Sequence, residues 1–440
     1  MDWDLRHGMA SRTTSPAGKP STLHKYCQGL FLLPIPSSII LFGYINCMGI
    51  SYYFQIEDSA ATYTYLLVAY GWAIACTLLS RKILITSLDI WTGILVTIII
   101  FGYIVNSGIV KQLVFVILLA LNYLFGRHIQ YAQLPSLFKS IFAVGVLTIA
   151  LSLHELPSFF RGWTTSVWRP ELYGNGAYAS AFAYFMGFLL IITIGWVVPN
   201  SRRKFISIFL LLLVSLIIIY SSARIVIVSC AFVLLILLYY HASMSLRKKL
   251  FTGTFSVALA LTTWTILPAN YREFNSLDED NGIILLLTEP LGTGDTLSLR
   301  SDESDFLTQN TLGMRIQIIR SCLVEYFKSP IFGYGPDRLF IPHNAFLQVL
   351  FEHGIIAGVI LASVWLKILF LMFRFIKHAN KIARSQLVLL LSMFIYTLLY
   401  ISVMGTTLTM NTTFFFMGVM VSLVTDVTGD LDKGPPLMRN

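Results

Sequence analysis

Apolar runs of about 20 residues recur along the whole length of the chain, and short polar connections separate them. A run of that length suits a transmembrane helix, because each residue adds about 1.5 Å and the hydrocarbon core of a bilayer is about 30 Å thick. The chain is 56% hydrophobic and only 12% charged, whereas about a quarter of the residues of a soluble domain are charged. The sequence therefore predicts an all-α, polytopic integral membrane protein.

The apolar runs predict about twelve membrane helices. We place them at residues 30–50, 61–80, 83–105, 109–126, 135–153, 177–198, 205–220, 224–241, 250–268, 345–374, 385–402 and 404–425. The chain then divides into a cytoplasmic tail (1–29), nine membrane helices (30–268), one long loop (269–342), three further membrane helices (343–425) and a second cytoplasmic tail (426–440).

The formal charge of +9 raises the question of an anionic partner such as nucleic acid. Most basic residues, however, lie in the two tails and in every second connection. The alternate short connections carry only Lys111, Arg161, Arg169 and Arg224. Because cytoplasmic loops are enriched in Lys and Arg, we expect cytoplasmic termini, a long loop on the outer side of the membrane, and no nucleic-acid partner.

The second half of the long loop has the pattern of an amphipathic helix. Its apolar residues recur at helical spacing at Leu312, Ile316, Ile319, Leu323 and Phe327. Ser329-Pro330 ends the pattern, since proline cannot continue a helix. A turn at Gly333-Tyr334-Gly335-Pro336 then leads into the tenth membrane helix.

Arg224 opens the eighth predicted membrane helix, in the sequence Tyr220-Ser221-Ser222-Ala223-Arg224. A cation is unfavourable at a helix N-terminus, because the helix dipole is already positive there. The free amides, the Ser222 hydroxyl and the guanidinium together suit a bound anion. The alternative is an arginine that reaches lipid headgroups.

His343 lies in Pro342-His343-Asn344, directly before the tenth membrane helix. Histidine suits proton transfer near neutral pH, although an interfacial hydrogen bond is an alternative role. Eleven residues at 100° bring Gly354 to within about 20° of the same helix face. Gly354 and Gly358 have the GxxxG spacing that allows a neighbouring helix to approach closely.

Further candidate residues flank these positions. Arg315 lies on the predicted loop helix, and Arg320, five residues later, is an alternative functional arginine. Arg338 precedes His343, and Arg169 lies in an outer connection that also contains Trp163, Trp168 and Tyr173. Aromatic faces there suit sugar rings, or else form an interfacial belt.

Other acidic residues and the cysteines give weaker signals. Asp278-Glu279-Asp280 and Glu57-Asp58 have the residue types of metal or acid sites, and Asp89 is interpreted as a packing or snorkelling residue. The five cysteines lack metal-ligand spacing. Walker A, dinucleotide-binding and serine-nucleophile motifs are absent, which disfavours ATP-driven transport and hydrolysis of the soluble type. We therefore expect no cofactor and assign no metal ligands, and metal dependence stays open.

Three segments in this order resemble the O-antigen ligase and polymerase family of membrane glycosyltransferases. They are Ser221-Ser222-Ala223-Arg224, then Gly313-Met314-Arg315 through Ser329-Pro330-Ile331-Phe332-Gly333-Tyr334-Gly335, then His343-Asn344 with Gly354 and Gly358. The family pattern has a His-Asn or His-Ser pair, nine residues, a glycine, and a small residue or tyrosine three positions later. Ala357 occupies that last position here.

The resemblance implies an inverting glycosyltransferase on the periplasmic face of the bacterial inner membrane. Its donor is a glycan on undecaprenyl diphosphate, and its acceptor is lipid A-core or another lipid-linked glycan. Arg224 and Arg315 would hold the diphosphate, His343 would orient or deprotonate the acceptor hydroxyl, and Ser222, Asn344, Arg169, Arg338 and Arg320 would contact substrate. Ligase, polymerase and protein O-oligosaccharyltransferase activities stay open, as does a secondary lipid or sugar transporter.

Overall fold

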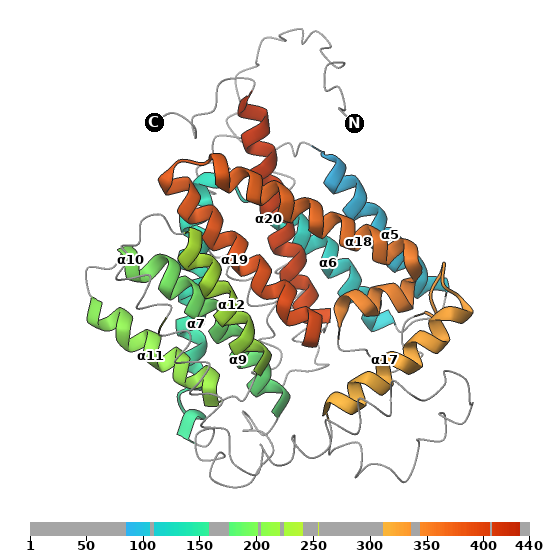
Figure 1. The fold of residues 1–440 in the computed structure, drawn as a ribbon, viewed down its shortest axis with the longest axis horizontal. Coiled ribbons are helices and arrows are strands. Elements are labelled where there is room, and N and C mark those ends of the chain that lie inside the picture. The colour runs from blue at the N-terminus through green and yellow to red at the C-terminus, as the bar shows by residue number, and fades with distance from the viewer. Residues whose placement is uncertain are drawn as a thin grey trace.

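The computed structural model describes residues 85–105, 110–157, 176–200, 204–220, 224–240, 254, 311–335, 344–404 and 407–431. Within these ranges every regular element is a helix, which confirms the all-α class. The elements are α5 (Ser87–Val105), α6 (Val110–His128), a 3-10 turn (Tyr131–Gln133), α7 (Leu134–Ser152), α9 (Gly176–Ile192), a π-helical segment (Thr193–Val197), α10 (Val198–Asn200), α11 (Lys204–Tyr220), α12 (Arg224–Tyr240), α17 (Thr311–Lys328), α18 (Ala345–His378), α19 (Lys381–Met404) and α20 (Thr407–Leu431). Figure 1 shows their arrangement.

Helices that could cross a membrane coincide with predicted spans. Four described helical stretches are long and apolar enough: Ser87–Val105, Tyr131–Ala150, Ala345–His378 and Ile382–Ser402. Shorter apolar helices lie at Val116–His128, Phe182–Val197, Phe205–Ile219, Ile225–Leu237 and Asn411–Thr425. The predicted spans at 30–50, 61–80 and 250–268 lie outside the described residues, apart from residue 254, so the total of about twelve stays a prediction.

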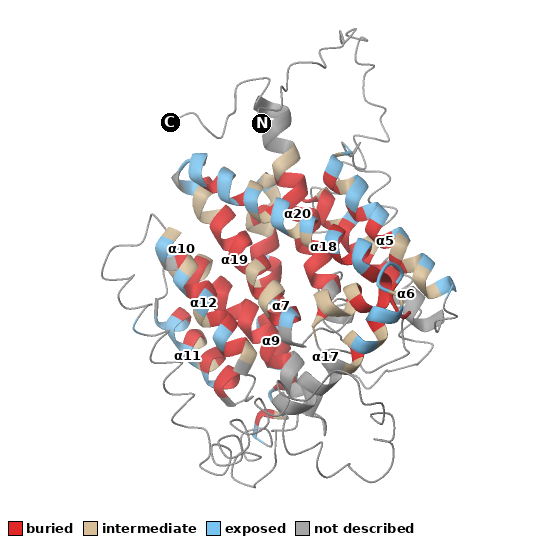
Figure 2. Cartoon of the chain, turned by 45° about the vertical axis from the view of Figure 1, so that its right-hand side comes forward, coloured by how far each residue is buried: buried red, intermediate tan, exposed pale blue. Residues whose placement is uncertain are grey.

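The helices form two packed groups (Figure 1). One contains α5, α6, α18 and α20, and the other contains α7, α9, α11, α12 and α19. Contacts of α19 with α18 and α20 join the groups. Figure 2 shows buried residues where the helices face one another and exposed residues on the outward faces of peripheral helices. On α11 those outward residues are large and apolar, including Phe205, Phe209 and Leu212, as expected of a lipid-facing surface.

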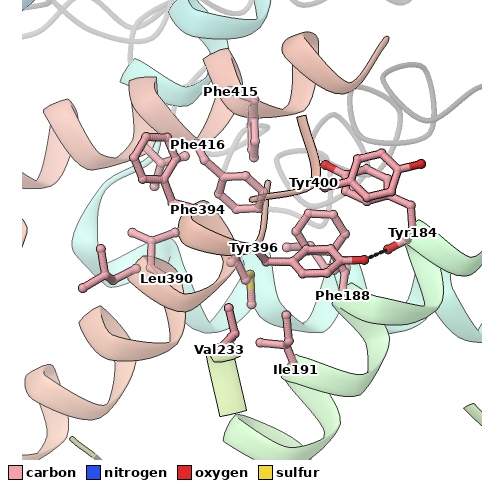
Figure 3. Close-up of a cluster of buried hydrophobic side chains, with 14 of the residues drawn as sticks. Tyr184, Phe188, Ile191, Val233, Leu390, Phe394, Tyr396, Tyr400, Phe415 and Phe416 are labelled. Atoms are coloured by element: carbon pink, nitrogen blue, oxygen red, sulfur yellow. Dashed lines mark hydrogen bonds between the residues drawn. The ribbon is translucent and has the colours of Figure 1, made fainter. Parts of the chain in front are cut away.

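An aromatic cluster fills the centre of the second group (Figure 3). Tyr396 of α19 stacks on Tyr184 of α9, with ring centroids 5.4 Å apart, and meets Phe188 edge-on at 4.9 Å. The Tyr396 hydroxyl donates a hydrogen bond of 2.9 Å to the Tyr184 carbonyl. Aromatic pairs in these geometries contribute about 0.5–1.5 kcal/mol beyond the burial of their area, and the cluster therefore fixes α9 against α19.

Two glycines allow α6 and α20 to form the most extensive helix–helix contact among the described residues. A Cβ at Gly126 would lie 2.1 Å from the Phe415 carbonyl oxygen, and one at Gly418 would lie 2.1 Å from the Tyr123 carbonyl oxygen. Small residues at such crossings bring helix backbones together in membranes. The Asn122 amide adds a buried hydrogen bond of 3.2 Å to the Asn411 side-chain oxygen.

Asp89 is a partner in a partly buried ion pair. Its carboxylate accepts hydrogen bonds from Arg127 Nε at 2.7 Å and Nη2 at 3.1 Å, and from the Tyr123 hydroxyl at 2.7 Å. The carboxylate also accepts hydrogen bonds from the Thr86 amide and hydroxyl. These bonds cap the start of α5. Asp89 is thus a packing residue, and it is held by charge pairing rather than by snorkelling. A bidentate arginine pair of this kind compensates the desolvation of both charges.

We expect Gly418→Ala to destabilise the protein by roughly 1–3 kcal/mol, because the added methyl group forces α6 and α20 apart. Thermal unfolding in detergent measures this effect. The matched control is Gly93→Ala on α5, where an added Cβ meets no atom within 4 Å. That control should be neutral or stabilising by about 0.4–1 kcal/mol. Equal unfolding temperatures for the two variants would contradict the close approach.

Candidate functional site

Helix α18 is broken at Gly354, where φ is 84° and ψ is 175°. A break removes backbone hydrogen bonds from the residues on either side, and a membrane offers no water to replace them. The loop after α17 replaces them here. Its backbone makes three hydrogen bonds to the two sides of the break: from Tyr334 N to Phe351 O (2.9 Å), from Gly335 N to Glu352 O (3.1 Å), and from Ile355 N to Pro330 O (2.9 Å).

This docking requires glycine on both sides of the contact. A Cβ at Gly354 would lie 1.9 Å from the Ile331 carbonyl oxygen, and one at Gly333 (φ 74°) would lie 2.4 Å from the Glu352 carbonyl oxygen. The GxxxG interpretation is therefore wrong for this pair, because Gly354 meets a loop rather than a helix. Gly358 faces the Leu350 side chain of its own helix.

The break also bears on two predictions about the tenth membrane helix. A regular helical register does not continue through Gly354, and His343 lies outside the described residues, so the predicted shared face stays a prediction. The part from Ile355 to His378 rises roughly 35 Å by itself, enough to cross a bilayer core. The preceding segment, Ala345–His353, is therefore not needed to cross the membrane and can contribute residues to the site.

Helix α17 packs on this first segment of α18. Cys322, Tyr326, Tyr334 and Phe351 form a buried cluster, against which Leu323, Leu347 and Leu350 pack. The Tyr334 hydroxyl donates a hydrogen bond of 3.4 Å to Cys322 Sγ, and burial raises the pKa of this thiol. Residues beyond the break do not join the cluster. α17 therefore runs alongside the first segment of α18 in the same direction (Figure 1).

Asn344 begins α18 and ties it to α19. Its side-chain oxygen accepts a hydrogen bond of 2.9 Å from the Leu347 amide, which makes it the N-cap. Its side-chain nitrogen donates a hydrogen bond of 2.7 Å to the carbonyl of Ser402, near the end of α19. We call this end of the bundle the Asn344 end.

The backbone of Arg224 lies at the same end. The far end of α12 is marked by Tyr240, whose ring is 6.3 Å from that of Phe373, near the end of α18. Midway along α12, Cys230 lies beside Tyr396 of α19. α12 and α19 are therefore antiparallel, and the first residue of α12 lies level with the last turn of α19, where Asn344 binds.

Helical register separates the two candidate arginines of α17. Arg315 is seven residues before the buried Cys322, about 20° short of two full turns, and therefore on the same face of the helix. Arg320 is two residues before Cys322, about 200° away, and lies on the opposite face. Because Cys322 faces α18, position 315 lies on the α18 side of the helix.

One buried acidic residue was missed by sequence reasoning. Glu352 is only 5% exposed and accepts a hydrogen bond of 3.1 Å from the side-chain nitrogen of Gln348. Asn344, Gln348 and Glu352 are spaced four apart, so they form a polar stripe on one face of the first segment of α18. The four-residue spacing of these polar residues within an otherwise apolar helix is the sequence signal that could have identified Glu352.

His353 is also buried, and it faces α5. It is 5% exposed, and its ring centroid lies 5.7 Å from that of Tyr103. A Cβ at Gly102 would lie 2.6 Å from its Nδ1. The break at Gly354 therefore lies between α17, on the Glu352 side, and α5, on the His353 side.

The remaining predicted site residues lie outside the described residues. These are His343, Ser222, Arg169 and Arg338. For Arg224, Arg315 and Arg320 the backbone positions alone are described. Within the described ranges, His, Cys, Asp and Glu side chains form no group of three that could hold a metal ion.

Residues 188–362 match the family model described as O-antigen ligase. We call this segment of the chain the O-antigen ligase domain, after the model that it matches. This domain includes the start of α12, the whole of α17, the docked loop and the break in α18. No curated protein matches the chain. This match and the apolar helices together support a bacterial membrane protein of the ligase and polymerase type.

We expect Asn344→Ala to destabilise the O-antigen ligase domain by about 0.5–2 kcal/mol through loss of the N-cap, with a further loss from the bond to Ser402. Asn344→Asp is the matched variant, because it keeps the cap acceptor and replaces the donor to Ser402 by a carboxylate oxygen that the Ser402 carbonyl repels. Thermal unfolding should rank wild type above Asp, and Asp above Ala. Equal stability of wild type and Asp would show that the Ser402 contact contributes nothing.

Proposed function

We propose that the protein transfers a glycan from undecaprenyl diphosphate to an acceptor sugar, which is lipid A-core or a growing surface polysaccharide. The observation that carries this proposal is the convergence at the Asn344 end. The start of α12 with Arg224, the α17 face with Arg315, and the residue after His343 all belong to this end of the O-antigen ligase domain.

In this proposal the cations stabilise the leaving group. Arg224 and Arg315 contact the diphosphate, whose negative charge grows as its bond to the anomeric carbon breaks. Preorganised cations in a partly desolvated site stabilise such charge by several kcal/mol. The departing diphosphate keeps the electron pair and needs no proton, so two arginines can take the place of a metal ion.

His343 acts on the acceptor in the same step. Its imidazole takes the proton of the acceptor hydroxyl while that oxygen attacks the anomeric carbon from the face opposite the diphosphate. The configuration at that carbon is thereby inverted. The Asn344 cap and its bond to Ser402 hold the start of α18, and His343 is the residue directly before it in the chain.

The charge distribution supports a periplasmic site. The end of the bundle opposite Asn344 carries Lys367, Arg374, Lys377 and Arg384, and Arg384 donates to carbonyls at the end of α18. Basic residues are enriched on the cytoplasmic side of membranes. We therefore assign the Asn344 end to the periplasm.

Glycan transfer by purified protein tests the proposal. The donor is an undecaprenyl-diphosphate glycan extract, supplied with lipid A-core or alone, with and without chelator. We expect chelator-resistant transfer to lipid A-core, and His343→Ala should slow it by about 10²–10⁴-fold. Lengthening of donor chains without lipid A would make the protein a polymerase instead. No transfer by folded protein with matched substrates would refute the glycosyltransferase assignment and favour a transporter.

The two arginines of α17 provide a sharper prediction. Arg315→Gln should slow transfer by about 10²–10³-fold, the usual effect of removing one preorganised donor. Arg320→Gln is its matched control and should change the rate by less than about threefold, as expected of a solvated cation. Initial rates with saturating donor measure both variants. If Arg320→Gln slowed transfer more than Arg315→Gln, the functional arginine would be at position 320.

A further inference from the structure

Large apolar side chains are exposed at the end of α17 and in the loop that follows it. Phe327 is 71% exposed, Ile331 54% and Phe332 75%, and Val324 on the preceding turn is 45% exposed. The buried side of α17, with Cys322 and Tyr326, already packs on α18. We call these four exposed residues the Phe332 patch. Exposed apolar residues that are neighbours in the chain in this way are typical of an interaction surface.

The Phe332 patch continues onto exposed apolar residues of α18. Ile355, Ile356 and Val359 are each about half exposed and lie at the start of the segment that crosses the membrane. The hydrogen bond from Ile355 N to Pro330 O joins the two surfaces directly. The patch therefore lies beside the start of the membrane-crossing segment of α18.

The charges beside the patch suit a headgroup region. Lys328 follows Phe327, its side chain is 64% exposed, and it pairs with Glu325 one turn earlier. A lysine can place its stem along apolar surface and its ammonium among lipid phosphates. An aromatic residue beside a basic one is typical of segments at a membrane interface.

We infer that the end of α17 and the loop through Phe332 insert into one membrane leaflet, at the boundary between headgroups and acyl chains. The occupant of the patch is the lipid itself. Because the same loop pairs with the break at Gly354, the leaflet anchors the loop, α17 and the first segment of α18 as one unit. This inference does not depend on the proposed glycan transfer.

Photo-crosslinking of the full chain in phosphatidylethanolamine and phosphatidylglycerol nanodiscs tests the inference. Benzoylphenylalanine replaces Phe332 in one variant and Phe327 in a second, and mass spectrometry identifies the adducts after illumination. Phe370, an exposed residue within the α18 span, is the lipid-facing control. Glu325, about 200° around α17 from Phe327, is the matched control on the same helix.

We expect phospholipid adducts at positions 332 and 327, with yields within about twofold of position 370 and roughly fivefold above position 325. Thermal unfolding before illumination confirms that each variant is folded, and the two patch positions test the proposal independently. Adducts to another segment of the same chain, adducts to a second copy, or no lipid adducts while position 370 reacts would each overturn the proposal.

Discussion

The pairing of a loop backbone with the break in α18 is the interaction on which the described part of the O-antigen ligase domain depends. At Gly354 the chain leaves helical geometry, and the carbonyls of Phe351 and Glu352 and the amide of Ile355 need new partners. The loop from Pro330 to Gly335 supplies them. In a membrane these groups have no solvent alternative, so the loop and the helix are fixed to each other.

This pairing gives α18 two functions. Its longer segment crosses the membrane, and its shorter segment, Ala345–His353, carries the Asn344 cap and the polar stripe to Glu352. α17 packs on that shorter segment, which sets position 315 on the side that faces α18. The cap then binds the end of α19, beside which α12 begins at Arg224. Elements distant in sequence thus meet at one end of the bundle through a short series of contacts.

The rest of the bundle provides a rigid support for that end. The glycine contacts between α6 and α20, the aromatic cluster between α9 and α19, and the Asp89–Arg127 pair each fix two helices to each other. All three rest on packing or on fully paired polar groups, which a lipid environment requires. Proposed roles for Arg224, Arg315 and His343 require such a support, because the position of a catalytic group must be held closely.

Local patterns in the sequence determined the helical membrane class, the described apolar helices, the amphipathic α17 and the family resemblance, because hydrophobic runs and their period depend on neighbouring residues alone. Only the tertiary structure decided that Gly354 breaks α18, that Asp89 pairs with Arg127, that Glu352 is buried, and that position 315 rather than 320 lies on the α18 side of α17. A positive φ held by a distant loop leaves no periodic signal. A glycine that meets a loop backbone has the same spacing as one that meets a helix, so partners far apart in the chain could be identified only after folding.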